Sequence, residues 1–159
     1  MIEERYQTFT VLIAKIARSI RKIKTEEMKH FHLKSPHVTC LHVLYNAPEG
    51  LTAKDLCDLC DEDKASVSRT VEFLENGGYV VCDSMAKKRY KAAFTLTEKG
   101  KEVGKFIAEK IDAVLASASV GVSEEHREIL YRSLAMIGEN LQQICDNYEV
   151  SSNGSTNHR

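Results

Sequence analysis

Residues 51–81 read LTAKDLCDLCDEDKASVSRTVEFLENGGYVV, which is two short amphipathic segments separated by an acidic turn. Thr52 and Asp55 have the spacing of a capping box, in which each side chain accepts a hydrogen bond from the other residue's backbone N–H. A short helix is therefore expected to begin directly after Thr52. Apolar residues at helical spacing would form its buried side, namely Leu56, Leu59 and Cys60.

The second amphipathic segment predicts a helix over residues 64–76. Asp63 stands directly before it and can cap its first turn. Gly77 and Gly78 are expected to end it, because glycine readily adopts the left-handed conformation in which many helices terminate. The inner face of this helix would consist of Val67, Val71 and Leu74.

Two short segments rich in β-forming residues follow, over residues 79–82 and 93–96. The loop between them is basic, and residues 86–91 carry a net charge of +4 because they contain four cations and no acid. Two helices joined by a tight turn and followed by a hairpin with a charged tip form a winged helix-turn-helix. The predicted fold class is mainly α with a small β-hairpin wing.

The second helix of a helix-turn-helix enters the major groove of DNA and presents the side chains of its first turns to base edges. Here those turns carry hydroxyl groups and one guanidinium, which suit contacts with bases and phosphates. The basic loop would neutralise phosphates or reach into the adjacent minor groove. The alternative is an ordinary amphipathic helix beside a solvated turn. The predicted DNA-binding residues are Thr52, Lys54, Lys64, Ser66, Ser68, Arg69, Thr70, Lys87, Lys88, Arg89 and Lys91.

Long amphipathic helices are predicted near both ends of the chain. Apolar residues recur at alternating spacings of four and three from Ile2 to Ile23 and again from Leu130 to Tyr148, which is a heptad pattern. An N-terminal helix of about 28 residues would be roughly 42 Å long, too long to bury a whole face within so small a domain. A partner chain is the expected cover for the excess.

Local signals place the remaining helix starts. Ser35 and Pro36 indicate one, with serine as the cap and proline at the first helical position. Thr97 and Ser123 are expected to cap two further helices, each of which has an apolar face.

These elements predict a winged helix-turn-helix over residues 35–97, flanked by long helices within residues 1–34 and 98–150. The polar tail over residues 151–159 is expected to be disordered.

The composition is that of an ordinary globular protein. The 159 residues are 43% hydrophobic and 28% charged, and they include only two prolines and eight glycines, which favours long helices. The net charge is −1, but residues 5–34 contain eight cations against two anions and residues 101–150 contain five against nine. Such asymmetry can give a neutral protein a local positive surface, although solvated helix faces would produce the same count.

Nothing in the sequence predicts a membrane partner. No apolar run is long enough to span a bilayer, and lysine and arginine interrupt every apolar stretch near the N-terminus. The five cysteines are an odd number in a chain without an export signal, which favours reduced thiols. A cytoplasmic protein is expected.

Three stretches in register resemble the MarR (multiple-antibiotic-resistance regulator) family. They are LTAKDL at residues 51–56, DKASVSRTV with LENGGYV at residues 63–80, and LTEKG at residues 96–100. The resemblance covers about residues 5–148 and implies an obligate homodimer that binds a pseudo-palindromic operator in double-stranded DNA. Its two reading helices would lie about one DNA turn, roughly 34 Å, apart. The resemblance also implies a helical dimerisation region formed by residues 1–34 and 98–150, and the heptad patterns agree with this. The expected interface residues are Tyr6, Phe9, Ile13, Ile16, Leu134, Ile137, Leu141 and Ile144. Repression is the expected mode, because a dimer bound at a promoter blocks polymerase without further contacts.

The wing departs from the family pattern, in which an Asp-x-Arg pair precedes the Leu-Thr motif. The corresponding positions hold Lys88 and Tyr90, and Arg89 is one residue away. The wing lysines would then act through phosphate charge rather than through minor-groove insertion.

Regulators that this chain resembles often change their DNA affinity when a small molecule enters the cleft between the dimerisation region and the winged module. A ligand does so by binding one conformation better than another. The resemblance implies a cleft lined by the first, second and fifth helices. Tyr45 could instead be a core residue and Arg18 a solvated one. The effector-pocket candidates are Arg18, Phe31, His42 and Tyr45.

Cysteines and histidines suggest two further possibilities. Cys57 and Cys60 have the spacing of a Cys-x-x-Cys redox pair, but they lie inside a predicted helix and away from its N-terminus, where thiolates are favoured. Buried packing is the favoured interpretation, and a cysteine-based redox-sensing regulator is kept as an alternative. No metal site or cofactor is expected, because zinc ligands on helices prefer other spacings than those of His30, His32, His37 and His42.

Two other classes of protein compete with a DNA-binding regulator. The Gly-x-Gly-x-x-Gly, Gly-x-Ser-x-Gly and Walker patterns do not occur, so enzymatic activity is not expected. A helical protein-interaction module built on the heptad patterns is the stronger rival. The salt dependence of binding distinguishes a DNA-binding regulator from a protein-interaction module. DNA binding through several phosphates weakens steeply as the salt concentration rises, and hydrophobic association does not.

Overall fold

The chain forms two compact units, Met1–Val114 and Leu115–Arg159. The structure, a computed structural model, describes residues 5, 7–83 and 92–154, and the last six of these by their backbone alone. Within these residues, no helix combines the length and the hydropathy that crossing a membrane requires. The division of the chain into a dimerisation region and a DNA-binding region stays a prediction.

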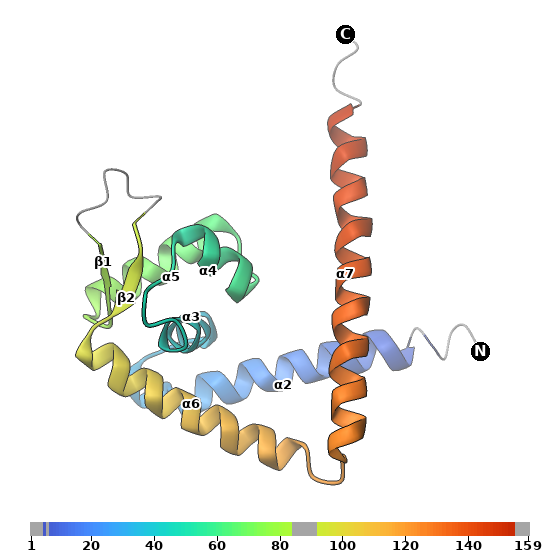
Figure 1. Ribbon diagram of the computed structural model, residues 1–159, viewed down its shortest axis with the longest axis horizontal. Helices are drawn as coiled ribbons and strands as arrows, with labels where there is room; N and C mark the ends of the chain where they lie inside the picture. Colours follow the sequence, from blue (N-terminus) through green and yellow to red (C-terminus); the bar gives the residue numbers. More distant parts are fainter. Residues whose placement is uncertain (1–4, 6, 84–91, 155–159) are drawn as a thin grey trace. The chain divides into compact units, whose positions relative to one another are not determined.

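The first unit begins with the long amphipathic helix that the heptad pattern predicted. A π-helical turn, η1 (Gln7–Val11), leads into α2 (Leu12–Glu27), and a 3₁₀ turn, η2 (Lys29–Phe31), follows (Figure 1). His32 ends this turn in the left-handed conformation, with φ of 58°. The described helical run is therefore not α-helical throughout. Neither η1 nor α2 buries a residue within the chain.

A winged helix-turn-helix follows in the predicted order. Its helices are α3 (Ser35–Tyr45), α4 (Ala53–Cys60) and α5 (Lys64–Asn76), and its strands are β1 (Val80–Cys82) and β2 (Phe94–Leu96) (Figure 1). The fold class is confirmed as mainly α-helical with a small β-hairpin.

The two strands pair antiparallel, with Val81 opposite Thr95 at the centre. A third backbone segment joins them through Leu51, which exchanges both of its backbone hydrogen bonds with Phe94 at 3.1 and 2.8 Å. The hairpin is thereby fixed to the residues that precede α4.

The start of α3 differs from the sequence-based expectation. Lys34 is the N-cap, Ser35 is already helical and Pro36 takes the second helical position. The backbone N–H of Lys34 donates to Nδ1 of His37 at 3.0 Å, which is the bond that the third helical residue of a capping box makes back to the N-cap. The prediction that Ser35 caps this helix was wrong, because the helix begins one residue earlier than expected.

The predicted caps of α4 and α5 are present. Oγ1 of Thr52 accepts from the Asp55 N–H at 3.3 Å, and the Asp55 carboxylate accepts from the Thr52 N–H at 2.9 Å. The Asp63 carboxylate accepts from the Ser66 N–H at 2.7 Å. Gly78 takes the left-handed conformation after α5, with φ of 72°.

The core of this unit lies among α3, α4, α5, the hairpin and the first half of α6 (Glu98–Ala118). Each fully buried leucine stabilises the fold by about 1.5–3 kcal/mol relative to an exposed one. The largest side chains with almost no exposure are Met28, Leu33, Leu41, Leu44, Leu56, Leu74 and Ile107.

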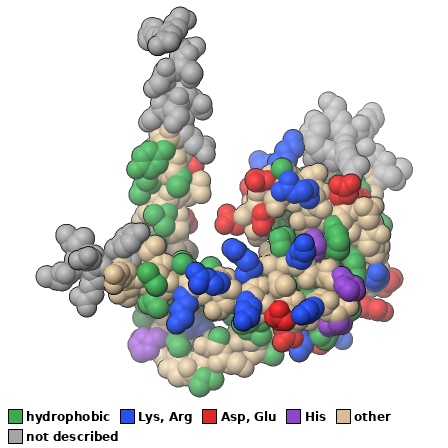
Figure 2. Space-filling model, turned by 180° about the vertical axis from the view of Figure 1, so that it is seen from behind, with side chains coloured by type: hydrophobic (Ala, Val, Ile, Leu, Met, Phe, Trp, Pro, Cys, Tyr) green, Lys and Arg blue, Asp and Glu red, His purple; other side chains and the backbone are tan. Residues whose placement is uncertain are grey.

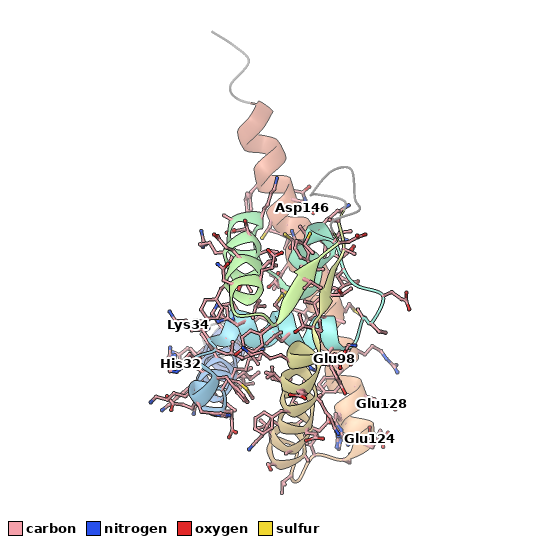
Figure 3. The ribbon with its side chains drawn as sticks, turned by 90° about the vertical axis from the view of Figure 1, so that its left-hand side faces the viewer. His32, Lys34, Glu98, Glu124, Glu128 and Asp146 are labelled. Atoms are coloured by element: carbon pink, nitrogen blue, oxygen red, sulfur yellow. The ribbon has the colours of Figure 1, made fainter. Side chains whose placement is uncertain are left out.

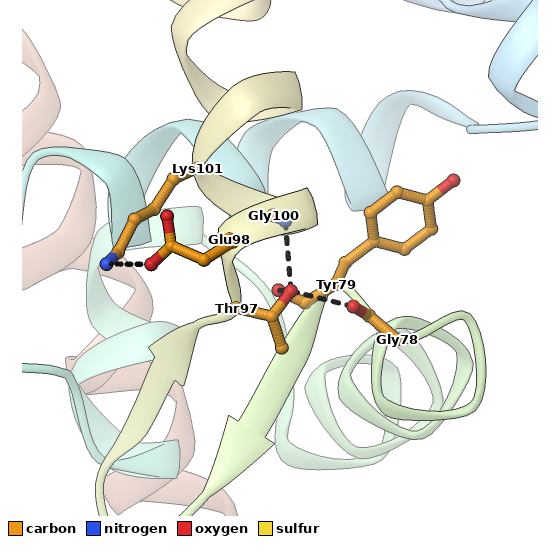
Figure 4. Close-up of polar contacts among 6 residues, drawn as sticks. All are labelled: Gly78, Tyr79, Thr97, Glu98, Gly100 and Lys101. Carbon is orange, nitrogen blue, oxygen red and sulfur yellow. Dashed lines mark hydrogen bonds and ion pairs between the residues drawn. The ribbon is translucent and has the colours of Figure 1, made fainter.

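A tight joint connects the hairpin to α6. The Thr97 hydroxyl donates to the Gly78 carbonyl at 2.7 Å and accepts from the Gly100 N–H at 3.0 Å, while the Thr97 N–H donates to the Tyr79 carbonyl at 3.0 Å (Figure 4). A Cβ atom on Gly100 would lie only 2.0 Å from the Tyr79 carbonyl oxygen, so the close approach requires glycine here. We name this arrangement of Gly78, Tyr79, Thr97 and Gly100 the Thr97 joint.

The second unit is dominated by α7 (Glu124–Gly154). As predicted, Ser123 caps it, since Oγ of Ser123 accepts from the His126 N–H at 3.3 Å. Figure 3 shows Glu124 and Glu128 on the first turns of this helix, where the helix dipole favours carboxylates. The helix runs four residues into the tail that was expected to be disordered, and residues 155–159 lie outside the described part.

Candidate nucleic-acid interface

Helix α5 buries one face and exposes the other. Val67, Val71 and Leu74 point into the core, at exposures of 5% or less. The opposite face of the first two turns is exposed and carries Lys64, Ser68 and Arg69, while Ser66 is half-buried. The half of α5 that a helix-turn-helix offers to DNA is therefore its positively charged half.

Arg69 is the strongest candidate for contact with a base. No hydrogen bond or ion pair among the described residues engages its guanidinium, and the side chain is exposed. A guanidinium with all of its donors available can form two parallel hydrogen bonds to guanine or to a phosphate.

The structure removes Thr70 from the predicted set. Its side chain is 8% exposed and lines a small cavity beneath α5 together with Leu56 and Val67. A residue enclosed in this way cannot contact DNA without a change of fold. Thr70 falls on the same helical stripe as the buried valines, and that spacing was a better guide than its hydroxyl group.

At the start of α4, Thr52 and Lys54 differ in whether their side-chain donors are available for contact with DNA. The Thr52 hydroxyl donates to the Asp55 carboxylate at 2.7 Å as part of the capping box, so its donor is already used. These hydrogen bonds from Thr52 lower the pKa of Asp55. Lys54 is exposed in the first turn of the helix and is available to a phosphate.

The wing residues predicted to contact DNA lie outside the described residues, so their role stays a prediction. The structure describes the base of the wing, where the backbone N–H of Asp83 donates to the Ala93 carbonyl at 2.8 Å and continues the ladder beyond β1. The predicted wing contacts are Lys87, Lys88, Arg89 and Lys91.

Further positive charge lies along α2. Figure 2 shows lysine and arginine side chains gathered along this helix. All of the cations between residues 15 and 22 are exposed on it, which agrees with the solvated-face interpretation of the basic N-terminal stretch. They are Lys15, Arg18, Arg21 and Lys22.

Three of the four effector-pocket candidates lie against α6. The Phe31 ring meets the Phe106 ring edge to face, with 5.8 Å between centroids. The Tyr45 ring packs against Gly104, where a Cβ atom would lie 2.9 Å from it. Arg18 lies on the exposed surface of α2, and none of the described interactions joins it to the other three.

His42 has an unusual environment. Its Nδ1 atom is enclosed and has no hydrogen-bond partner among the described residues. Burial and the Lys24 ammonium lower the pKa of His42, while the carboxylate of Asp112 on α6 opposes them. A neutral imidazole with an unused nitrogen could bind a polar group of a ligand.

The resemblance led us to expect the fifth helix, which is α6, in this region, but sequence reasoning named none of its residues. Phe106, Lys110 and Asp112 all lie on it, and the Lys110 ammonium forms an ion pair with Glu27 of α2 at 3.0 Å. The apolar spacing of α6 indicated which side is buried, but no local signal indicated which distant residues would meet it.

Residues 33–89 match the MarR family model. Several solved structures share the fold. The transcriptional regulator SlyA is 23% identical, with a TM-score of 0.79 over 87% of this chain and 97% of that one. MepR in the S. aureus MepR–DNA complex is 19% identical, with a TM-score of 0.75 over 84% of this chain and 97% of that one. NMB1585, a MarR family regulator from Neisseria meningitidis, is 17% identical, with a TM-score of 0.77 over 91% of this chain and 98% of that one.

Proposed function

Because the chain belongs to the MarR family of winged-helix proteins, we propose that it is a sequence-specific transcriptional repressor that binds a pseudo-palindromic operator as a homodimer. The observation that carries this proposal is the exposed first half of α5, where Lys64, Ser68 and the unengaged guanidinium of Arg69 face outward. The MepR–DNA complex, in a protein of the same fold, supports double-stranded DNA as the partner.

The exposed apolar residues support a homodimer. Ile13, Ile16 and Ile20 of α2 are 40–54% exposed, and Leu130, Leu141 and Ile144 of α7 are 48–49% exposed. Both sets follow heptad spacing, which is the pattern by which helices of two chains bury one another. A two-fold axis would place the two α5 helices on successive major grooves, about 34 Å apart.

We also propose a small-molecule effector that binds near Phe31, His42 and Tyr45 and favours one conformation of the dimer. The aromatic rings and the unpartnered Nδ1 of His42 suit a ligand with an apolar body and one polar group. The proposed location is the cytoplasm, where operator DNA is accessible, and no enzymatic activity is proposed.

Fluorescence anisotropy with DNA from immediately upstream of the gene tests this function. We expect one dimer per site, with random DNA as a poor competitor. Affinity should fall on the order of a thousandfold or more between about 50 and 200 mM salt if six to ten phosphates are contacted. In the variant with Lys87→Ala and Lys88→Ala, all sequences should bind more weakly and the salt dependence should flatten.

Two other outcomes of this experiment would indicate a different function or a different operator. Salt-sensitive binding without sequence preference would indicate a general DNA binder or a distant operator. Absence of binding at low salt would contradict the proposal and favour the protein-interaction module.

A further inference from the structure

Helix α5 carries an acidic side chain on the face that points away from the core. Successive residues of an α-helix are rotated by about 100°, so the buried residues of α5 define the direction of its outward face. Four exposed residues lie within roughly 30° of that direction. We name them the outward stripe, and they are Ala65, Arg69, Glu72 and Asn76.

Glu72 belongs to the centre of this face, and its carboxylate is available. Lys64 and Ser68 are also exposed, but they lie toward one side of the outward stripe. No hydrogen bond or ion pair among the described residues engages the Glu72 carboxylate. Residues three apart on a helix are neighbours, yet no ion pair joins Glu72 to Arg69 in the part of the chain that the structure describes. A carboxylate and a guanidinium therefore both face outward, about 4.5 Å apart along the helix axis.

A carboxylate at this place is selective, because most of what DNA presents repels it. The phosphates are anionic, and guanine and thymine present only acceptor atoms at the positions where they can hydrogen-bond in the major groove. The donors there are the N4 amino group of cytosine and the N6 amino group of adenine. The adenine amino group lies beside the acceptor N7, so cytosine is the base that a carboxylate matches best.

We propose that Glu72 selects cytosine in the operator by accepting a hydrogen bond from its N4 amino group. The cytosine lies within about two base pairs of the base that Arg69 contacts, because three helical residues advance about 4.5 Å and one base-pair step about 3.4 Å. This inference rests on the proposed function, since it names a base that the same interface discriminates.

The effect of Glu72 is opposite in sign to that of the cations on this surface. Loss of a cation that contacts phosphate weakens binding to every sequence. Loss of the Glu72 charge instead removes a repulsion from the sequences that lack cytosine at this position. The carboxylate therefore contributes discrimination, and its removal should strengthen binding to the wrong sequences.

Selection from a pool of random duplexes locates the position. The full chain is incubated with the pool, and the bound duplexes are amplified and sequenced. We expect the wild type to require cytosine at one position in each half-site, within about two base pairs of the position at which Arg69→Lys loses its preference. Glu72→Gln should change only the cytosine position, and toward adenine, because a glutamine amide pairs with N6 and N7 of adenine.

Fluorescence anisotropy then measures the discrimination on the selected duplex. An adenine–thymine pair in place of the cytosine–guanine pair should weaken binding of the wild type roughly five- to 150-fold. The same replacement should not weaken binding of Glu72→Gln. Glu75→Gln is the matched control, because it removes the same charge from the same helix at a half-buried position outside the outward stripe. It should retain the full preference for cytosine.

The outcomes separate this inference from the proposed function. An enriched operator with the same base preferences for the wild type and Glu72→Gln would overturn the cytosine contact and leave the proposed function unaffected. Loss of the cytosine preference in Glu75→Gln as well would overturn the contact too, because net charge rather than the outward stripe would be responsible. Absence of any enriched sequence with the wild type would overturn the proposed function, and this inference with it.

Discussion

Arg69 shows how much of DNA recognition can rest on one side chain. Helix α5 buries its apolar stripe, and this orients the remaining face of its first turns outward. Ser68 and Lys64 flank Arg69 on that face, but only the guanidinium can form two parallel hydrogen bonds to one base.

Replacement of Arg69 is therefore the most direct test of base recognition. Arg69→Ala should weaken operator binding by about 1–3 kcal/mol, roughly five- to 150-fold, while the dimer stays intact. Arg69→Lys is the matched control, because it keeps the charge and loses the paired donors. It should retain binding to random DNA and lose most of the preference for the operator in the anisotropy assay. Unchanged operator affinity in Arg69→Ala would show that α5 does not read this sequence.

Gly100 supports a prediction about stability. In Gly100→Ala the new Cβ would meet the Tyr79 carbonyl oxygen at 2.0 Å, so the backbone must shift. We expect a loss of about 1–3 kcal/mol in the free energy of unfolding, measured by chemical denaturation. Gly138→Ala is the control, since nothing lies within 4 Å of its added Cβ. It should raise stability by roughly 0.5–1 kcal/mol, because alanine is the better helix former. Equal stabilities of the two variants would contradict the close approach.

The helices of the winged module differ in how well the sequence predicted them. The bounds of α5 agree with the expectation at both ends, because Asp63 and the two glycines are signals within a few residues of the ends they set. The start of α3 was misplaced, because the side chain of His37 satisfies the Lys34 N–H and histidine is not a usual signal for a cap.

Contacts between distant residues could not be predicted in the same way. The sequence indicated a possible pair of Cys57 and Cys60 because they are neighbours on one helix. The position of Cys40 and Cys60 on one small cavity depends on how α3 packs against α4, which no local spacing encodes. The fifth helix was expected near Phe31 and His42, but its contacting residues, Phe106 and Asp112, could not be named for the same reason.

The contact of α3 with α5 should make stability depend on pH. The His37 ring stacks on Phe73, with 4.0 Å between centroids and 4° between planes, and its Nδ1 accepts from the Lys34 N–H. Burial and the Lys34 ammonium lower the pKa of His37. The unfolded chain therefore binds a proton more readily, so stability is full above about pH 6.5 and is lost as the pH falls toward the folded-state pKa.

His37→Gln should weaken this dependence. The melting temperature of the wild type should fall more between about pH 7 and pH 5 than that of the variant. Part of the dependence should remain, because burial also lowers the pKa of His42. Parallel melting profiles of wild type and variant would show that the ring does not sense pH.

The exposed apolar residues on α2 and α7 support a prediction about the oligomeric state of the protein. A chain that leaves Ile13, Ile16 and Ile20 exposed by 40% or more along one seam gains stability if a second copy covers them. Ile16→Glu should convert the dimer into monomers, because it would bury an unpaired carboxylate in that seam. Light scattering after size exclusion measures the mass. Lys15→Glu is the matched control, since it adds the same carboxylate beside the seam and should leave the dimer intact. A dimeric Ile16→Glu protein would show that α2 is not in the interface.

The Thr97 joint has a consequence for genetics. Its hydrogen bonds attach the start of α6 to the end of α5 and to β1, so the hairpin and α6 cannot move independently of each other. Substitutions there would misplace the elements proposed to contact DNA, although none of the joint's residues is among the proposed contacts. A screen of random mutants for constitutive expression of the target gene should therefore return temperature-sensitive alleles at Thr97 and Gly100 alongside alleles in α5.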